Sequence, residues 1–439
     1  SHLGGEFFKT DGTVAANYDE ADLSRRFIDG PIDHGFDYAL TLPGGIQESP
    51  YAFFKNDRLS RWDNDLKEFV HFDRDDKARI HFKKFFNEEI KLDEFMMDNW
   101  TTESVGPLLM RDALRFIDAH MEEYGTGKPF FMHYCSQAGH VPYVPPVAFN
   151  INDPTDTEDL TKEGALPVKG QTVNIRTDMM YECDLALGLF VEKLQEKGIL
   201  KNTLIIFSSD NGAAEGINQE WSKSVYETPR EGKFGGNRTE TGNNRKKAVH
   251  INAQGVTKNG YPLRGQKGYV YEGGHRVPLI FRWGNGIPSG HVVEDQLISL
   301  HDIFRTVASI VGISPDSESG LDSYDFSEVL RQPGISHDPV REYLFIQSNE
   351  QNIERTTIRW AAYHQEKGNM NPDLWKAIIQ IPRTLYGKDF PDALERAKAL
   401  ELYYLSGDPT ESNNLANSVK LKEMEMIFKR ELKRERTAQ

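Results

Sequence analysis

Apolar residues recur at helical spacing over residues 104–123 and again over 174–197, with charged residues between them, so each segment predicts an amphipathic helix. The first leads into the apolar run 129–134 and the second into 203–209, and such short continuous runs are typical of buried strands. A third run covers 277–283 and precedes a helix expected over 302–311. This alternation predicts an α/β fold built on a large, mostly parallel sheet that is flanked by helices.

The pattern changes near residue 335. Short runs at 343–346, 356–363 and 401–405 alternate like strands of an antiparallel sheet, and a charged helix is expected from about residue 418. We therefore expect two domains, 1–335 and 336–439. The second should be a smaller antiparallel sheet with a helix.

Composition narrows the possible partners. The chain of 439 residues is 38% hydrophobic, enough for a real core, and its formal net charge of −15 argues against a nucleic-acid partner. No apolar run is long enough to span a bilayer. The two cysteines, Cys135 and Cys183, offer neither a disulfide framework nor zinc-ligand spacing.

Asp210 and Asn211 follow the expected strand 203–209, at the strand end where ligands bind in open α/β sheets. A carboxylate beside an amide oxygen suits Ca²⁺ or Mg²⁺. Because Asp-Asn-Gly is also strong turn chemistry, these residues taken alone favour a simple turn.

Two further segments carry groups that could act on an ester. His140 follows the apolar run 129–134 and could protonate a leaving group, although a surface or capping histidine fits as well. Lys267 lies in a glycine-rich stretch with Arg264, His275 and Arg276 nearby, and could bind an oxyanion. The alternative is a glycine-rich connection with solvated charges. His2 has no informative local context.

Taken in order, these segments resemble the formylglycine-dependent sulfatases of the alkaline-phosphatase superfamily, and the likeness runs along nearly the whole chain. The most specific part is the combination of Ser209–Gly212 with a Leu-Arg-x-x-Lys-Gly-x-x-x-Glu-Gly-Gly-x-Arg-x-Pro segment. The matching segments are Ser1–Gly4, His34–Tyr38, His140–Pro142, Ser209–Gly212, Leu263–Pro278 and Glu401–Ala416.

The resemblance implies a role for each candidate. Asp210 and Asn211 would be this chain's share of the ligands of a Ca²⁺ ion, with Mg²⁺ as the alternative. Lys267 would hold sulfate oxygens, and His140 would bind substrate and protonate the leaving oxygen. His2 would contact the formylglycine hydroxyl. The chain would then be a sulfuric ester hydrolase.

The sequence also departs from the family pattern. It contains no Cys/Ser-x-Pro-x-Arg motif for the formylglycine nucleophile, no Asp-Asp metal pair near its start, and no lysine two residues before His2. We therefore expect 1–335 to be a catalytic domain without its N-terminal part, the missing segment lying upstream or in a separate chain. On that expectation the present chain alone would be inactive.

Three functions stay open at this point. The first is hydrolysis of a sulfate ester, on a sulfated carbohydrate or a small sulfated molecule. The second is hydrolysis of a phosphate or phosphonate ester within the same superfamily. The third is non-catalytic binding by a chain without a nucleophile. By resemblance the protein would be periplasmic or secreted, although we recognise no signal peptide in these residues.

Overall fold

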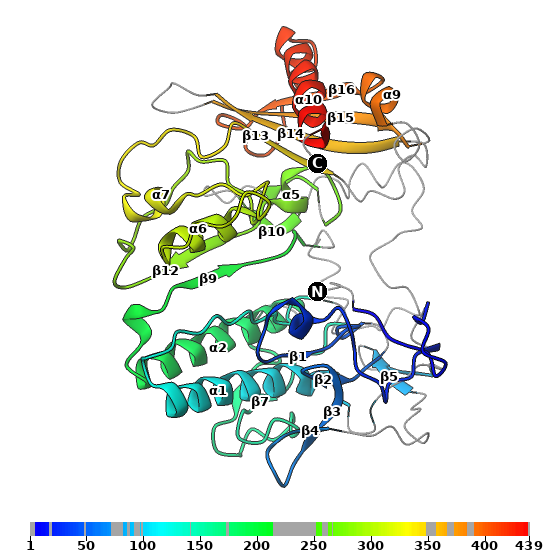
Figure 1. Ribbon diagram of the computed structural model, residues 1–439, viewed down its shortest axis with the longest axis vertical. Coiled ribbons are helices and arrows are strands. Elements are labelled where there is room, and N and C mark those ends of the chain that lie inside the picture. Colours follow the sequence, from blue (N-terminus) through cyan, green and yellow to red (C-terminus); the bar gives the residue numbers. More distant parts are fainter. Residues whose placement is uncertain are drawn as a thin grey trace. The chain divides into compact units, whose positions relative to one another are not determined.

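The chain folds into two compact units. The computed structural model describes residues 5–16, 20–47, 50–71, 82–85, 88–91, 97, 100–140, 142–172, 175–213, 252–256, 262–265, 267–347, 357–366, 373–383 and 390–437. Of these, the residues up to Leu200 form the first unit and those from Lys201 onward form the second. Figure 1 shows the elements of both units in chain order.

The strands of the first unit are short and antiparallel. A four-stranded sheet has the order β1-β2-β3-β4, and two separate pairs are β5-β6 and β7-β8. The strands are β1 Leu40–Thr41, β2 Phe53–Lys55, β3 Arg58–Asp63, β4 Glu68–His71, β5 Phe82–Phe85, β6 Glu88–Lys91, β7 Ala148–Phe149 and β8 Leu166–Pro167.

The first unit contains the two long helices that the apolar spacing of the sequence predicts. They are α1 Val105–Tyr124 and α2 Ile175–Glu196. Pro107 lies in the first turn of α1, where its missing N–H costs no helical hydrogen bond, and Gly125 ends this helix with a positive φ of 55°. The apolar faces of the helices meet in a core that includes Met110, Leu114 and Ala186.

The second unit begins with a two-stranded sheet of β9 Ile205–Ser208 and β12 Leu279–Arg282. Around it lie β10 Asn252–Val256, β11 Pro262–Leu263, α5 Glu272–His275, α6 Asp302–Ile310 and α7 Ser327–Arg331. The expected strands at 203–209 and 277–283 and the expected helix at 302–311 therefore form. The strands are less buried than expected, because β9 is half-buried and Ile280 of β12 is 56% exposed.

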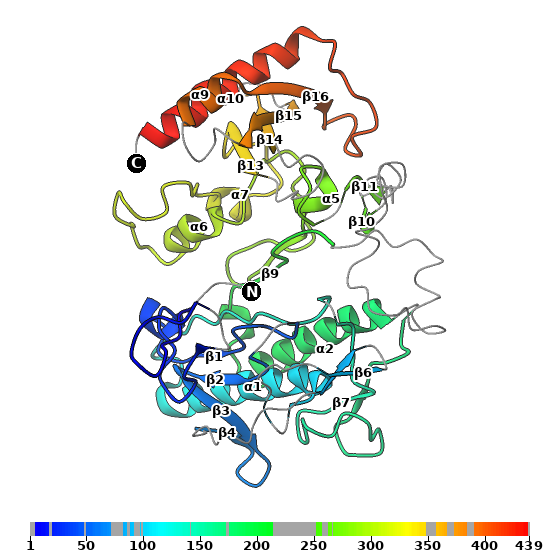
Figure 2. The ribbon, with the colours of Figure 1, turned by 90° about the vertical axis from the view of Figure 1, so that its right-hand side faces the viewer.

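A four-stranded antiparallel sheet closes the second unit, as the sequence predicts. Its order is β13-β14-β15-β16, and α10 packs along one face together with α9 (Figure 2). The bounds are β13 Tyr343–Gln347, β14 Thr357–Gln365, β15 Leu374–Pro382, α9 Phe390–Glu395, β16 Lys398–Tyr404 and α10 Val419–Thr437. Strand β15 was not expected from the sequence.

Both faces of this sheet are buried, and one of them lies against the loop that carries the candidate site. One face packs on the helices through Trp360, Ile379 and Phe428. The other face packs on the loop segment around Val270 and Tyr271. Because side chains alternate between faces along a strand, the second face can carry polar groups toward that loop without disturbing the helical side.

Two expectations need correction. The run 129–134 forms no strand: it is extended, with successive side chains alternately exposed, and Phe131 is 71% exposed. A strand requires a neighbour to complete its ladder, and no described strand pairs with this run. In addition, β9 and β12 pair antiparallel, so the expected parallel pairing does not occur among the described strands.

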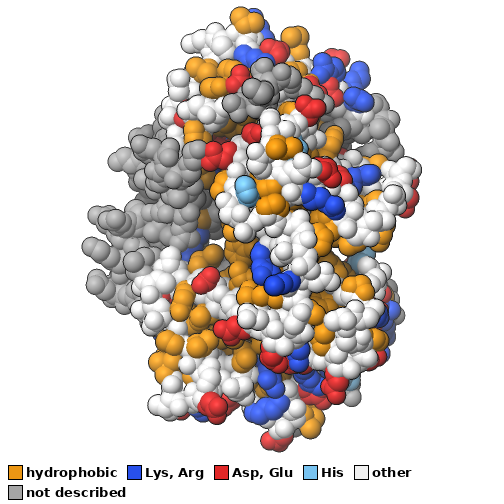
Figure 3. Space-filling view, turned by 90° about the vertical axis from the view of Figure 1, so that its left-hand side faces the viewer, with side chains coloured by type: hydrophobic (Ala, Val, Ile, Leu, Met, Phe, Trp, Pro, Cys, Tyr) orange, Lys and Arg blue, Asp and Glu red, His pale blue; other side chains and the backbone are white. Residues whose placement is uncertain are grey.

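The remaining expectations concern the surface and the domain boundary. No helix in the described ranges is long and apolar enough to cross a membrane. Several large hydrophobic side chains of the second unit are exposed near α6 and α7, including Phe304, Val311, Ile313 and Leu321. Figure 3 shows hydrophobic side chains among polar ones on the side that carries these helices. The domain boundary near residue 335 stays a prediction.

Candidate functional site

The candidate site of the second unit begins at the turn that follows β9. Ser209 closes this turn by donating a hydrogen bond from Oγ to the carbonyl oxygen of Asn211, at 3.0 Å. Asp210 is exposed and Asn211 is half-buried. The turn interpretation of Asp-Asn-Gly is therefore correct for the backbone, and it leaves both side chains at the end of the strand.

Backbone contacts join this turn to the glycine-rich segment that carries Lys267. The amide of Gly212 donates to the carbonyl oxygen of Gly274 at 2.9 Å, and the amide of Lys267 donates to the carbonyl oxygen of Ala213 at 2.7 Å. A Cβ on Gly212 would lie 1.9 Å from the carbonyl oxygen of Gly273, so only glycine fits there. The structure thus brings Asp210, Asn211 and Lys267 to one place.

Lys267 is held by its backbone on a turn between two glycines. Gly265 and Gly268 have φ values of 82° and 86°, in the left-handed region that favours glycine. The Lys267 side chain is half-buried and forms no ion pair with any residue of the described ranges. Its ammonium group is therefore available to an anionic ligand.

The oxygen ligands at this turn are of the type that a hard cation prefers, but they are too few to bind it alone. Asp210 supplies carboxylate oxygens and Asn211 an amide oxygen, which are the ligand types of Ca²⁺ and Mg²⁺. Neither side chain makes a hydrogen bond within the described part of the chain. No group of three potential metal-ligating side chains occurs among the described residues. Two ligands are fewer than the six to eight, roughly, that Ca²⁺ takes.

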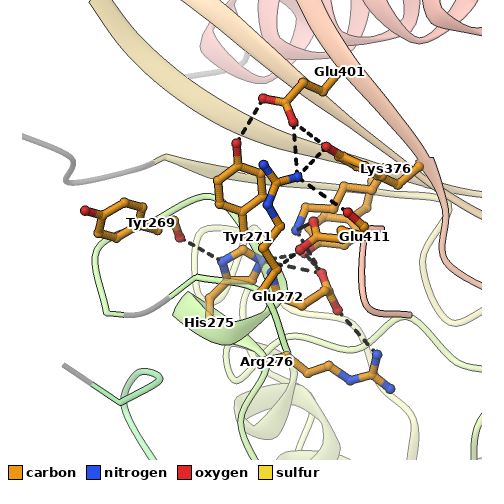
Figure 4. A network of polar contacts seen from close by, with 11 residues as sticks. Tyr269, Tyr271, Glu272, His275, Arg276, Lys376, Glu401 and Glu411 are labelled. Carbon is orange, nitrogen blue, oxygen red and sulfur yellow. Dashed lines mark hydrogen bonds and ion pairs between the residues drawn. The ribbon is translucent and has the colours of Figure 1, made fainter. Parts of the chain in front are cut away.

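Behind the Lys267 segment lies a buried polar cluster, which we call the Glu272 network and define as Glu272, His275, Tyr363, Lys376 and Glu411 (Figure 4). Nζ of Lys376 lies 2.9 Å from Oε1 of Glu272 and 2.7 Å from Oε1 of Glu411. Tyr363 donates its hydroxyl to Oε1 of Glu272 at 2.5 Å and contacts Nε2 of His275. The cluster therefore places two carboxylates around one ammonium group.

The register of the strands explains why Tyr363 and Lys376 of this cluster lie on one face of the sheet. Tyr363 of β14 is paired with Lys376 of β15, which in turn is paired with Tyr403 of β16. Residues directly opposite one another project from the same face of a sheet. The three side chains therefore form one row that faces the Lys267 segment.

Burial and charge shift the pKa values in the network in opposite directions. Burial raises the pKa of Glu272, but Lys376 and then His275 outweigh it, and the net effect lowers this pKa to about 2. Burial raises the pKa of Glu411 to about 6 despite its ion pair with Lys376. Burial, followed by the charge of Lys376, lowers the pKa of His275 to about 4. At neutral pH we therefore assign His275 as neutral and Glu272 as ionised.

Arg264 ties the same segment to the sheet at a second place. Its guanidinium lies 3.8 Å from the centre of the Tyr271 ring, which is a cation–π contact. It also donates to the hydroxyl of Tyr403 at 2.5 Å and pairs with Glu401 at 3.3 Å. The sequence suggested Arg264 and His275 as positive charges near Lys267. The structure instead places both in contacts that hold the segment.

The structure does not test the two histidine candidates as parts of this site. His140 belongs to the first unit, where its backbone amide donates to the carbonyl oxygen of Gln137 at 3.2 Å. His2 lies outside the described residues. The roles expected for His140 and His2 therefore stay predictions.

Sequence reasoning missed Lys376 and gave Glu411 no role. One signal could have revealed Lys376: it is the only charged residue in the apolar run Leu374–Pro382. A single charge inside a buried strand requires a buried partner. Glu411 belongs to the closing segment that resembles the family, but the sequence does not show which residue it meets.

Comparison with known proteins identifies the family of the chain. The family model described as Sulfatase matches residues 63–313, which is more than half of the chain. The chain belongs to the sulfatase family. Its α/β fold is that of the alkaline-phosphatase-like superfamily.

Curated relatives are similar over much of the chain. The N-acetylgalactosamine-6-sulfatase of Rattus norvegicus is 25% identical over 343 residues, which cover 78% of this chain and 51% of the relative. The N-acetylgalactosamine-6-O-sulfatase of Bacteroides thetaiotaomicron is 23% identical over 411 residues, which cover 87% of this chain and 65% of the relative. The steryl-sulfatase of Mus musculus is 31% identical over 206 residues, which cover 47% of this chain and 26% of the relative. The chain spans about half the length of the N-acetylgalactosamine-6-sulfatases it matches.

A solved structure has the same fold. It comes from work on the metabolism of multiple glycosaminoglycans by Bacteroides thetaiotaomicron, and it superposes with a TM-score of 0.60 at 21% identity. The match covers 100% of this chain and 78% of the other. This likeness supports the fold.

Proposed function

We propose that the complete protein hydrolyses a sulfate ester and that its substrate is a sulfated carbohydrate. One observation carries the proposal: the backbone bond between Lys267 and Ala213 brings Lys267, which has no ion-pair partner among the described residues, to the turn of Asp210 and Asn211. A compact cation beside hard oxygen ligands suits a sulfate group, which is a tetrahedral oxyanion. Membership of the sulfatase family supports the same chemistry.

Each residue has a proposed part in the reaction. Lys267 would bind non-bridging sulfate oxygens and stabilise the charge that grows on them as the ester bond breaks. Asp210 and Asn211 would contribute oxygen ligands to a Ca²⁺ ion, with Mg²⁺ as the alternative. His140 would hold the substrate and donate a proton to the leaving alcohol oxygen. His2 would contact the nucleophile's hydroxyl.

Two groups typical of the family complete the proposal. When bound, a metal ion would supply polarisation of the sulfate oxygens, and the family's formylglycine would supply the nucleophile. The Cys/Ser-x-Pro-x-Arg motif that is modified to formylglycine does not occur in these 439 residues. The proposed activity therefore concerns the protein expressed from its complete gene. We also propose, by analogy with the family, that it acts in the periplasm or outside the cell.

The names of the relatives favour a carbohydrate. Two of the matched relatives are named for N-acetylgalactosamine-6-sulfate, whereas the steryl-sulfatase matches a shorter part of the chain. We therefore propose sulfated amino sugars as the first substrates to test. A small aryl sulfate serves as the comparison.

The test compares ester types on the protein expressed from its complete gene. Hydrolysis of N-acetylgalactosamine 6-sulfate, of 4-nitrophenyl sulfate and of 4-nitrophenyl phosphate would be measured with Ca²⁺ or Mg²⁺ and with a chelator. The proposal predicts that the sulfate esters are cleaved in preference to the phosphate ester. Preference for the phosphate would indicate a phosphate or phosphonate ester hydrolase. Binding of the sulfated sugar without any turnover would indicate a non-catalytic binding protein.

A further inference from the structure

Lys376 is a charged side chain in a place that normally holds an apolar one. It lies in the middle of β15, its side chain is 0% exposed, and Ala377 and Ile378 beside it are equally buried. A buried ammonium group is costly unless it is paired, and replacing such an ion pair by apolar groups often leaves stability unchanged or improved. The presence of Lys376 therefore points to a task other than overall stability.

Lys376, Glu272 and Glu411 each contact the other two and so form a closed triangle. Lys376 holds the Glu272 side chain, while Oε2 of Glu411 accepts the backbone N–H of Glu272 at 2.8 Å. Lys376 and Glu411 are themselves paired. Glu272 is thus fixed by both its side chain and its backbone.

Glu411 adopts an unfavourable backbone conformation at this point. Its φ of 55° lies in the left-handed region, which side chains other than glycine disfavour. Such a conformation persists only where surrounding contacts enforce it. The contacts at Glu411 include its carboxylate with Glu272 and Lys376, and its backbone amide, which donates to the carbonyl oxygen of Asp408 at 3.2 Å.

Glu272 is the first residue of α5, and the next residues of this short helix make the contacts that build the candidate site. Gly273 donates to the carbonyl oxygen of Arg264 at 2.6 Å, and Gly274 accepts the bond from Gly212 at 2.9 Å. A shift of Glu272 would therefore move both the Lys267 segment and the turn that carries Asp210. Arg264 connects the same segment to Tyr403 and Glu401 of the sheet, so the Glu272 contacts are one of two connections between sheet and site.

We propose that Lys376 and Glu411 are positioning residues that hold Asp210, Asn211 and Lys267 in register by fixing Glu272. The proposal rests on the proposed function, because it assigns these residues to the geometry of the sulfate site. It predicts that loss of Lys376 loosens the Lys267 segment while the rest of the unit stays folded.

A matched control comes from a second buried ion pair of the same unit. Arg341 pairs with Asp302 at the start of α6, and their side chains are 6% and 0% exposed. Its contacts lie with Asp302, Asp322 and Tyr324, away from the Lys267 segment. Replacing Arg341 by methionine therefore removes a buried charge of the same unit without touching the Glu272 network.

The experiment compares Lys376→Met with Arg341→Met in the protein expressed from its complete gene. Three quantities would be measured well below both melting temperatures: kcat, KM for a sulfate monoester, and hydrogen–deuterium exchange of peptides covering residues 264–276. The proposal predicts that Lys376→Met lowers kcat roughly 10- to 100-fold, the usual range for losing a group that orients a reacting residue, with little change in KM. It also predicts faster exchange in 264–276 for Lys376→Met only.

A purely structural role predicts a different result. If both variants lose melting temperature and neither changes kcat or the exchange of 264–276, Lys376 is not a positioning residue. If Lys376→Met does not fold, Glu411→Gln carries the test, because it keeps the side-chain shape and removes the charge that faces Lys376. Unchanged exchange and kcat in a folded Glu411→Gln protein would overturn the proposal.

The exchange measurement separates this inference from the proposed function. If the wild-type protein cleaves no sulfate ester but Lys376→Met still loosens 264–276 selectively, the positioning role stands and the proposed activity fails. If the wild-type protein cleaves sulfate esters and Lys376→Met leaves exchange and kcat unchanged, the positioning role fails and the activity stands.

Discussion

The backbone amide of Lys267 donates a hydrogen bond to the carbonyl oxygen of Ala213, with 2.7 Å between nitrogen and oxygen. The two residues are 54 positions apart in the sequence, and this bond makes the strand end at Asp210 and the glycine-rich segment parts of one site. The arrangement depends on backbone contacts, so its first tests are changes that disturb the backbone.

Replacing Gly212 by alanine should separate the turn that carries Asp210 from the glycine-rich segment that carries Lys267. The new Cβ would lie 1.9 Å from the carbonyl oxygen of Gly273, and a backbone atom cannot yield as a flexible side chain can. A displacement of the catalytic groups by about 1 Å can cost roughly 10²-fold in rate, so we expect kcat/KM on a sulfate ester to fall by about that factor.

Gly188→Ala is the matched control for this change. A Cβ on Gly188, in the middle of α2, meets no atom within 4 Å, so this variant should keep full activity and gain a little helix stability. Equal activity of both alanine variants would show that the close approach at Gly212 is not required.

His275 should make the stability of the protein depend on pH in a defined window. Its pKa is lowered from 6.5 to about 4 by burial and by the charge of Lys376. Between these values the unfolded chain binds a proton that the folded protein does not, so stability is lost as pH falls from 6.5 toward 4. We expect this residue to account for a loss of roughly 3 kcal/mol across the window.

The comparison of wild type with His275→Gln isolates this contribution. Glu411, whose pKa is raised to about 6, opposes it between about pH 4.5 and 6, but it does so in both proteins. Urea unfolding at several pH values should give a flatter stability curve for His275→Gln between pH 4 and 6.5. Parallel curves would mean that His275 titrates normally in the folded protein.

Glu182 should act in the opposite direction in the first unit. Its carboxyl is buried on α2, and burial raises its pKa to about 8, although a hydrogen bond from Gln137 at 2.6 Å lowers it in part. The folded protein then keeps a proton that the unfolded chain releases near pH 4.5. Stability should therefore fall as pH rises from 4.5 to 8.

Glu182→Gln keeps the shape of this side chain and removes its titration. We expect the variant to be more stable than wild type by roughly 2 to 5 kcal/mol at pH 8 and about equally stable near pH 4.5. Glu192→Gln, at an exposed position of the same helix, is the matched control for the change of residue type. A constant difference between Glu182→Gln and wild type at all pH values would refute the raised pKa.

The sequence predicted the elements whose pattern is local. The helices α1, α2 and α6 and the strands β9 and β12 followed from apolar spacing. The helices bury one face, whereas β9 is half-buried along its length and β12 alternates between half-buried and exposed side chains. The run 129–134 is mainly apolar, like β9, but no described strand pairs with it, and pairing cannot be read from composition. Strand β15 was missed although its apolar run is as long as its neighbours'.

The candidate site was predictable in part for the same reason. Asp210, Asn211 and Lys267 carry chemistry within recognisable motifs, and the structure brings them together. The Glu272 network depends instead on the register that aligns Tyr363, Lys376 and Tyr403 across three strands. Register is a long-range property, so the positioning role of Lys376 became visible only in the folded chain.

Lys267→Ala tests the central claim most directly. The measurement is kcat/KM for a sulfate monoester, on the protein expressed from its complete gene, beside wild type and Lys201→Ala, which removes an exposed lysine of the same unit. Loss of one preorganised electrostatic partner predicts a fall of roughly 10² or more for Lys267→Ala and no change for Lys201→Ala. Near-wild-type turnover by Lys267→Ala would contradict the account and remove Lys267 from the site.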